Sequence, residues 1–331
     1  MATAATPTWS IGARVYHLVV RHSITRRVAQ AVLVAFGVLV VSFLILRLTP
    51  GDPAQTVLGL DATPEAIAAM RVKLGLDGSW LTQFVNYVGP MFRGDLGTSI
   101  QNGQSVTNII WRSAPVTLQL IALTMILAVG ISLLLAVPIA RHRSGPWGLV
   151  FRVVTSMMIS VPVFFSGLLL ILLVAVHWHW LPVGGYKGSF PANLRYLILP
   201  AITACGPLMP ILLRVMQSSV ADTEEEAFVE TAIVRGLRGP KLGWRYLLRP
   251  SIAPTIALTA YIVGSLFGAA VVLELVFNLP GIGSRLLQAV QFRDYPVVQG
   301  IVFTMGILVV LVNLAADLIS AALDPRARSR S

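Results

Sequence analysis

The chain has 331 residues, of which 56% are hydrophobic and only 12% carry a charge, and its mean hydropathy is +0.78. A soluble domain carries about twice that share of charged residues, so the composition excludes an ordinary soluble protein. The net charge of +11 does not indicate a nucleic-acid partner, because the basic residues are spread between long apolar runs. The single cysteine, Cys205, excludes an internal disulfide and a cysteine-based metal site.

Six long runs without charged residues dominate the chain. Each reaches or exceeds the roughly 18 residues by which a transmembrane helix is recognised. The fourth run is the weakest, since it is short and contains Pro200, Pro207 and Pro210, but a membrane helix tolerates proline where neighbours satisfy the freed backbone groups. We therefore predict an all-α integral membrane protein with six transmembrane helices. The runs are 28–46, 113–140, 153–176, 196–213, 250–273 and 295–316.

Lysine and arginine residues predict the orientation of these helices, because cytoplasmic loops carry an excess of both. Sixteen of the 25 fall in one alternating set of segments, which includes both chain ends, and nine fall in the other. We therefore expect a multi-pass protein of the cytoplasmic membrane with both termini in the cytoplasm. In chain order the segments are the cytoplasmic 1–27, the first transmembrane helix 28–48, the extracytoplasmic loop 49–112, the five-helix core 113–322 with the cytoplasmic segment 214–249, and the cytoplasmic tail 323–331.

The long extracytoplasmic loop contains signals for two short helices. Thr63 precedes Pro64 as a helix start, and Gly75 is placed to end that helix. A second piece over 80–92 carries apolar residues at helical spacing. We expect both helices to lie on the outer membrane surface or against the transmembrane bundle.

Two histidines follow the third run, His177 and His179. Two ligands with no nearby cysteine or carboxylate are too few for a metal site. Tryptophans beside a membrane span are typical of the aromatic belt at the interface. We therefore assign this stretch to the belt and predict no metal site in the chain.

The cytoplasmic segment 214–249 contains the pattern of a short helix with defined ends. Thr223 followed by Glu226 matches a capping box, and acidic residues in the first turn suit the helix dipole. Gly236 stands where a left-handed residue ends a helix. These features predict a helix over 223–235.

One face of this helix suits contact with another protein. Phe228, Ala232 and Gly236 follow one another at intervals of four, so they share a stripe, and the two small residues permit close approach of a partner backbone. On spacing alone, the plainer interpretation is favoured: a solvated loop helix without a partner.

Two acidic residues lie within or beside the runs, Glu274 and Asp317. Ionisable groups in a bilayer are costly and are functional candidates, so both are candidates for a gate or a subunit contact. A transporter driven by protons or sodium usually has more polar groups near the membrane midplane. Their scarcity indicates that the energy for transport comes from elsewhere.

A motif in the cytoplasmic segment resembles a known family. Glu230-Thr231-Ala232, three further residues and Gly236 are similar to the E-A-A-x-x-x-G signature of binding-protein-dependent ABC importer permeases. Thr231 departs from the central alanine. The proline that closes the signature is matched by either Pro250 or Pro254.

Further tracts place the chain within that family. Together they resemble the first of the two permease subunits of a dipeptide or oligopeptide importer, in the peptide and nickel subgroup. Ala253 departs from the leucine that is more usual there. The tracts are 47–53, 75–77, 93–97, 248–254, 279–283, 293–300, 317–318 and 323–326.

The resemblance implies partners rather than catalysis by this chain. No G-x-x-x-x-G-K-[ST] phosphate loop occurs in the sequence, so ATP and Mg²⁺ are expected on separate ATPase subunits, either two chains or one fused chain. A second permease subunit and an extracytoplasmic solute-binding protein complete the expected complex, with a peptide as substrate. The residues expected to couple this chain to the ATPases are Phe228, Glu230, Thr231, Ala232, Gly236, Pro250 and Pro254.

Two alternatives remain at the level of the sequence. The first is the same machinery importing another solute: nickel, glutathione or an oligosaccharide. A stand-alone secondary transporter is a different class, and it would require inverted repeats or broken helices around a midplane site. The sequence indicates neither.

Overall fold

The protein is almost entirely helical in the computed structural model, which describes residues 9–48, 52–59, 61–141 and 145–323. Within these residues, the only strand-like pairing is an isolated bridge between Thr98 and Ser105. The helices are α1 Trp9–Arg47, α2 Pro53–Leu58, α3 Pro64–Lys73, α4 Trp80–Met91, α5 Val106–Arg141, α6 Pro146–Ser160, α7 Val163–Leu170, the π-helix η1 Ile171–His177, α8 Leu194–Glu224, α9 Ala227–Val234, α10 Gly239–Leu242, the π-helix η2 Gly243–Leu248, α11 Arg249–Val276, α12 Ile282–Gln291 and α13 Tyr295–Leu323.

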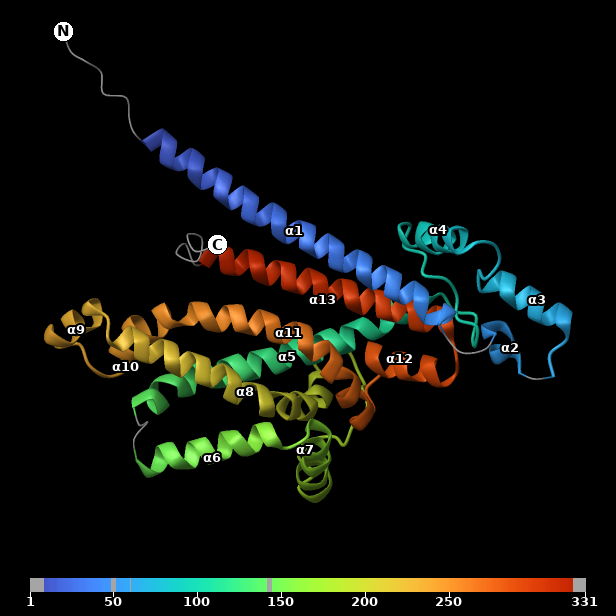
Figure 1. The fold of residues 1–331 in the computed structure, drawn as a ribbon. Coiled ribbons are helices and arrows are strands. Elements are labelled where there is room, and N and C mark those ends of the chain that lie inside the picture. The colour runs from blue at the N-terminus through green and yellow to red at the C-terminus, as the bar shows by residue number, and fades with distance from the viewer. Residues whose placement is uncertain (1–8, 49–51, 60, 142–144, 324–331) are drawn as a thin grey trace, which may run out of the picture.

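Five of the described helices are long and apolar enough to cross a membrane, and a bent pair forms a sixth span if it is counted as one. Helix α8 lies at the centre, with 61% of its most apolar window buried, and α1 lies at the edge, with 11% buried. Helices α5 and α11 pack on α8, whereas α1 packs on α13 (Figure 1). The prolines at 200, 207 and 210 all lie inside the continuous helix α8, so the fourth predicted span is confirmed.

The third predicted span, 153–176, is wrong as a continuous helix. The chain turns by 103° between α6 and the α7–η1 pair. Val161 has an extended backbone, with ψ 125°, and Pro162 follows it. Proline disfavours helical geometry in the residue before it, which explains the break. The expectation that the chain has no broken helix is therefore also wrong.

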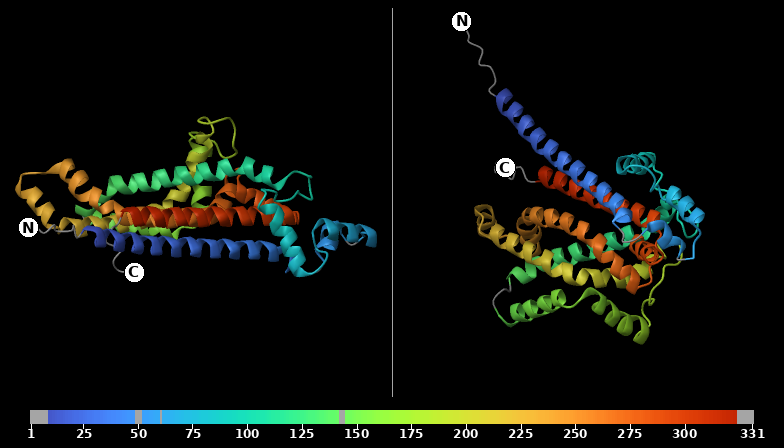
Figure 2. Two further views of the ribbon diagram at one scale, coloured as in Figure 1. Left: turned by 90° about the horizontal axis from the view of Figure 1, so that it is seen from above. Right: turned by 45° about the vertical axis from the view of Figure 1, so that its right-hand side comes forward.

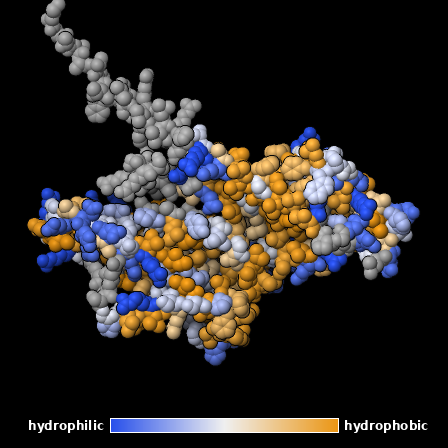
Figure 3. Space-filling view, in the orientation of Figure 1, coloured by the Kyte–Doolittle hydropathy of each residue, from blue (hydrophilic) through white to orange (hydrophobic). Residues whose placement is uncertain are grey.

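The bundle has two polar ends, and the first is named here the α9 end. It holds α9, α10, the beginnings of α1 and α6, and the end of α13 (Figures 1 and 2). The opposite end, the α12 end, holds α2, α3, α4 and α12. A broad apolar band separates more hydrophilic residues at the two ends on the face shown in Figure 3. The described parts of both terminal helices reach the α9 end, which agrees with termini on one side of the membrane. The segments 1–8 and 324–331, which include nearly all of the predicted C-terminal tail, lie outside the described residues, and α1 runs without a break from 9–27 into the first span.

The two predicted loop helices are confirmed as α3 and α4. Thr63 Oγ1 accepts a hydrogen bond from Ala66 N at 3.3 Å and caps α3, and Ser79 caps α4 in the same way. Gly75 follows α3 with φ +64°, the left-handed conformation that glycine adopts without strain.

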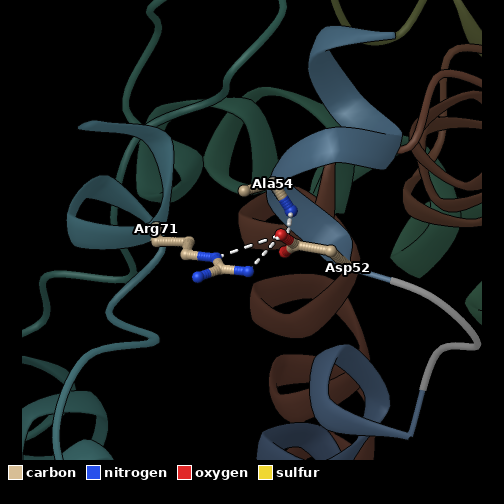
Figure 4. Close-up of polar contacts among 3 residues, drawn as sticks. All are labelled: Asp52, Ala54 and Arg71. Carbon is tan, nitrogen blue, oxygen red and sulfur yellow. Dashed lines mark hydrogen bonds and ion pairs between the residues drawn. The ribbon is translucent and has the colours of Figure 1, made fainter. Parts of the chain in front are cut away.

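Side-chain contacts tie this loop together at the α12 end. The Asp52 carboxylate accepts from Ala54 N at 3.1 Å, which caps α2, and from Arg71 Nη2 of α3 at 2.7 Å (Figure 4). Arg47, at the end of α1, donates to Gln83 Oε1 of α4 at 3.1 Å. The loop is therefore held against the end of the bundle.

Candidate functional site

The predicted cytoplasmic helix is shorter than expected at its N-terminus. Helix α8 continues through Thr223 to Glu224, and α9 begins only at Ala227, after Glu226 in an extended conformation. The Thr223 hydroxyl donates to the Ser219 carbonyl at 2.8 Å instead of capping α9. The capping-box prediction is therefore wrong. Thr223 is buried near the end of a long helix, where a threonine hydroxyl readily bonds the preceding turn.

The C-terminal end of α9 is confirmed. Gly236 has φ +81°, and the Leu237 N–H donates to the Ala232 carbonyl at 3.1 Å, as in a Schellman motif. A Cβ built on Gly236 would meet no atom within 4 Å. Glycine is therefore required here by its backbone conformation and not by crowding within this chain.

One side of α9 packs on its own chain. Val229 is fully buried and Ala232 is 3% exposed. They lie in a hydrophobic cluster with residues of α5, α8 and the α10–η2 segment, among them Met216 of α8 and Leu247 of η2. Helix α9 is thus attached to the bundle by its small and branched residues.

The outward side of α9 carries the exposed residues. Phe228 is 45% exposed and Val234 is 81% exposed, and Glu230 and Thr231 are exposed beside them. The expectation that Ala232 belongs to the exposed docking stripe is therefore corrected, because Ala232 faces the bundle. Ile233 and Val234 extend this exposed surface beyond the predicted stripe. The signal was present in the sequence, since six of the eight residues of α9 are apolar, alanines included, which is more than one buried face of two turns holds.

The Ser251 hydroxyl joins α8 to α11 beside this helix. Ser251 is fully buried, and its Oγ lies 2.8 Å from Thr223 Oγ1 and 3.1 Å from the Ser219 carbonyl of α8. Pro250 stands in the first turn of α11, where its missing N–H costs little, and Pro254 lies inside the helix. Which proline closes the family signature stays open, and the Thr223–Ser251 contact has no signal in local sequence patterns.

At the opposite end of α11, Glu274 is fully buried. Its carboxylate accepts from Thr117 Oγ1 of α5 at 2.5 Å and from Ser284 N of α12 at 2.8 Å. Thr117 Oγ1 in turn accepts from Ile282 N at 2.9 Å. A side chain at Gly281 would overlap the carboxylate. We call these five residues the Glu274 clasp, because they fasten α5, α11 and the start of α12 together.

The functional roles of the two acidic candidates stay predictions. The Glu274 carboxylate contacts groups of its own chain, on α5 and α12. Asp317 lies within α13, but its side chain lies outside the described part of the structure. No group of three or more histidine, cysteine or carboxylate residues suited to a metal occurs among the described residues.

In the stretch assigned to the aromatic belt, the rings of Trp178 and Trp180 stack at a centroid distance of 4.7 Å.

The apolar bundle, with its anchored polar-end helix, defines a multi-pass helical membrane protein. A family model described as binding-protein-dependent transport system inner membrane component matches residues 128–329, and one for the N-terminal part of such membrane components matches residues 20–121. The chain therefore belongs to the permease family of binding-protein-dependent ABC importers, a family of membrane components of the cytoplasmic membrane that is not itself catalytic.

Relatives support the same assignment over nearly the whole chain. The nickel import system permease protein NikB of Staphylococcus aureus strain USA300 is 33% identical, and the match covers 92% of each chain. The protein of the same name from the bovine strain RF122 is 32% identical with the same coverage. Membership implies an ATPase, a solute-binding protein and a second permease as partners. The sequence argument against a secondary transporter was the lack of broken helices, and the break between α6 and α7 removes it. The assignment to the importer family therefore rests on these matches.

Proposed function

We propose that this chain forms one half of the translocation pathway of an ATP-driven importer for di- or oligopeptides, and that α9 couples the pathway to the ATPases. The observation that carries the proposal is the two-sided character of α9. Val229 and Ala232 fix the helix to the bundle, while Phe228 and Val234 stand free on its outward side.

The contacts around α9 suggest how movement passes into the membrane. ATP and Mg²⁺ are bound by the ATPase subunits, which close on the nucleotide and displace α9. Because Val229 and Ala232 pack on α8 and η2, a displacement of α9 also displaces these two elements. The hydrogen bond between Thr223 of α8 and Ser251 of α11 transmits the movement of α8 to α11. The Schellman motif at Gly236 keeps the last turn of α9 from fraying and absorbing the displacement.

At the far end of α11, the Glu274 clasp passes that movement to α12. A shift of α11 at Glu274 displaces Ser284, which donates to the Glu274 carboxylate, and Ile282, which donates to Thr117. The α12 end then opens as the α9 end closes, which is alternating access. The α12 end thus forms the outer gate, and Glu274 is a positioning residue for it.

Two cargo classes have support. The peptide proposal rests on the resemblance of the tracts 279–283 and 293–300 to peptide importers. The second candidate is nickel, which is favoured by the names of the relatives at 32–33% identity. Both candidates use the same permease architecture and the same coupling helix.

Uptake by the complete importer distinguishes them. The permease pair, its ATPases and its solute-binding protein are reconstituted in liposomes with ATP inside, and uptake of a labelled peptide library is compared with that of radioactive Ni²⁺. We expect peptide uptake that requires ATP and the binding protein. Uptake of Ni²⁺ without peptide uptake would replace the peptide proposal, and uptake of either solute without ATP would contradict the coupling proposal.

A further inference from the structure

A polar cavity lies at the α12 end, outside the residues considered so far. Its volume is about 470 Å³, within the range of sites that hold small molecules. The hairpin 98–105, the beginning of α5 and the helices α12 and α13 surround it. The polar lining residues are Ser99, Gln101, Asn102, Gln104, Arg112, Ser113, Arg285, Gln288 and Asp294.

The wall formed by the hairpin is held in place by Asp294. This buried carboxylate accepts from Ser99 Oγ at 2.5 Å and from Ile100 N at 3.1 Å. Gln101 Nε2 also donates to the Phe292 carbonyl at 2.9 Å. Both carboxylate oxygens of Asp294 are thus occupied by the hairpin, so this wall of the cavity is held in place and the acidic residue is engaged.

The remaining charge in the cavity is positive. Arg112 of α5 and Arg285 of α12 both line it and are both exposed. Arg285 Nη1 donates to Gln288 Oε1 at 3.0 Å, and neither guanidinium forms an ion pair with any carboxylate in the described part of the chain. Two guanidinium groups with side-chain amides around them match a carboxylate, because arginine binds such a group through paired N–H donors.

Arg285 and Gln288 also border a second cavity of about 470 Å³. That cavity also lies along α12 and is lined by Glu274, Asn278 and Ser284 among others. The polar face of α12 therefore faces both cavities, and one of them reaches the Glu274 clasp. A ligand held by Arg285 would lie directly against α12, the helix to which the Glu274 clasp passes movement in the proposed function.

We propose that the first cavity, the outer vestibule, binds the carboxylate of the imported solute through Arg112 and Arg285 as it leaves the solute-binding protein. This inference rests on the proposed peptide import and assigns the C-terminal carboxylate of the peptide as the recognised group. The phosphate of an anionic lipid carries the same chemistry, so the test separates the two sources.

The experiment uses the complete reconstituted importer and a pair of peptides, one with a free C-terminal carboxylate and one with a C-terminal amide. Uptake is measured at several concentrations of loaded binding protein for the wild type, Arg112→Gln, Arg285→Gln, the double variant and Arg285→Lys. Arg93→Gln is the control, since Arg93 is an exposed arginine of the same outer region that does not line the cavity. Each preparation is made in zwitterionic lipid and in lipid with an anionic fraction.

We expect Arg285→Gln to raise the KM for the carboxylate peptide about 2- to 10-fold, the range for an exposed charge-assisted contact. Uptake of the amide peptide and ATPase activity without solute should stay unchanged, and Arg285→Lys should recover part of the effect. Equal effects on both peptides, or effects confined to anionic lipid, would overturn the vestibule inference while leaving peptide import intact. Absence of uptake of either peptide by the wild type would instead defeat the proposed function and the inference with it.

Discussion

At the scale of single residues, Gly236 links sequence to mechanism through its backbone. Its φ of +81° lies in the left-handed region, which costs a residue with a Cβ about 1–2 kcal/mol. Asparagine visits that region more readily than alanine or valine. The space around Gly236 is open within this chain. If backbone conformation alone restricts the position, asparagine should be tolerated better than alanine. If a partner protein packs against it, the larger asparagine should be tolerated worse.

We predict that Gly236→Asn is tolerated better than Gly236→Ala, although asparagine is larger. The alanine variant should destabilise the end of α9 by about 1–2 kcal/mol and lower the ratio of solute imported to ATP hydrolysed. Hydrogen exchange of the α9 amides and the transport ratio measure both effects. Gly89→Ala, at a helical glycine with equally open space, is the control. A worse result for asparagine than for alanine would indicate a partner packed against Gly236.

Asp52 provides a pH-dependent contact in the outer loop. The Arg71 guanidinium, which donates to its carboxylate, lowers the pKa of Asp52 from its ordinary value of 3.8. A depressed carboxyl pKa stabilises the fold above the ordinary value, and that stabilisation is lost as the pH falls through the lowered pKa. The contact is therefore intact at neutral pH and is lost only in strong acid.

We predict that pepsin cleaves the α2–α3 region of Arg71→Gln faster than that of the wild type at about pH 4, near the ordinary carboxyl pKa. The difference should vanish at lower pH, where Asp52 is protonated in both proteins. Lys73→Gln, which changes another basic residue of α3, should behave like the wild type. Equal cleavage of Arg71→Gln and the wild type at about pH 4 would show that the Asp52–Arg71 contact does not hold this loop.

At the scale of elements, the Glu274 clasp fixes where α12 begins. A buried carboxylate requires hydrogen-bond partners, and Glu274 finds them on α5 and α12 of its own chain. The sequence identified Glu274 as unusual, but it gave no indication of Thr117, because the two residues are far apart along the chain.

We predict that Thr117→Val destabilises the purified permease by about 1–3 kcal/mol, since both the Glu274 carboxylate and the Ile282 N–H lose a partner. Thr124→Val is the matched control on the same helix, because the one partner of its hydroxyl among the described residues is the Leu120 carbonyl one turn back. Thermal unfolding in detergent measures both variants. Equal stability of the two variants would show that the clasp does not hold α12.

Local signals predicted some elements and failed for others for identifiable reasons. Thr63 and Pro64 marked α3 because capping depends on neighbours in sequence. Thr223 matched the same kind of pattern, yet α8 continued through it, since tertiary packing on Ser251 decided the helix boundary. The break at Val161–Pro162 was hidden in a uniformly apolar run, although the residue before proline carried the signal.

At the scale of the whole molecule, the apolar runs predicted the bundle because membrane burial depends on composition alone. Which helix lies at the centre did not follow, since α1 and α8 are both apolar and only packing separates them. The candidate site could likewise be predicted only in part from the sequence. Its motif located α9, but the division into a buried side at Val229 and Ala232 and an exposed side at Phe228 required the fold.

The most direct test of coupling through α9 is ATP-driven uptake by the complete importer that carries Phe228→Ala. Phe228 is exposed on α9, so its truncation should leave the permease folded while weakening ATPase binding roughly tenfold, as loss of an interface anchor does. Phe92→Ala is the control, because Phe92 is also exposed and directly follows α4. We expect Phe228→Ala to retain fewer ATPase subunits and to take up less solute than the wild type, whereas Phe92→Ala keeps both at the wild-type level. Wild-type uptake by Phe228→Ala would contradict the claim that α9 couples ATP to transport.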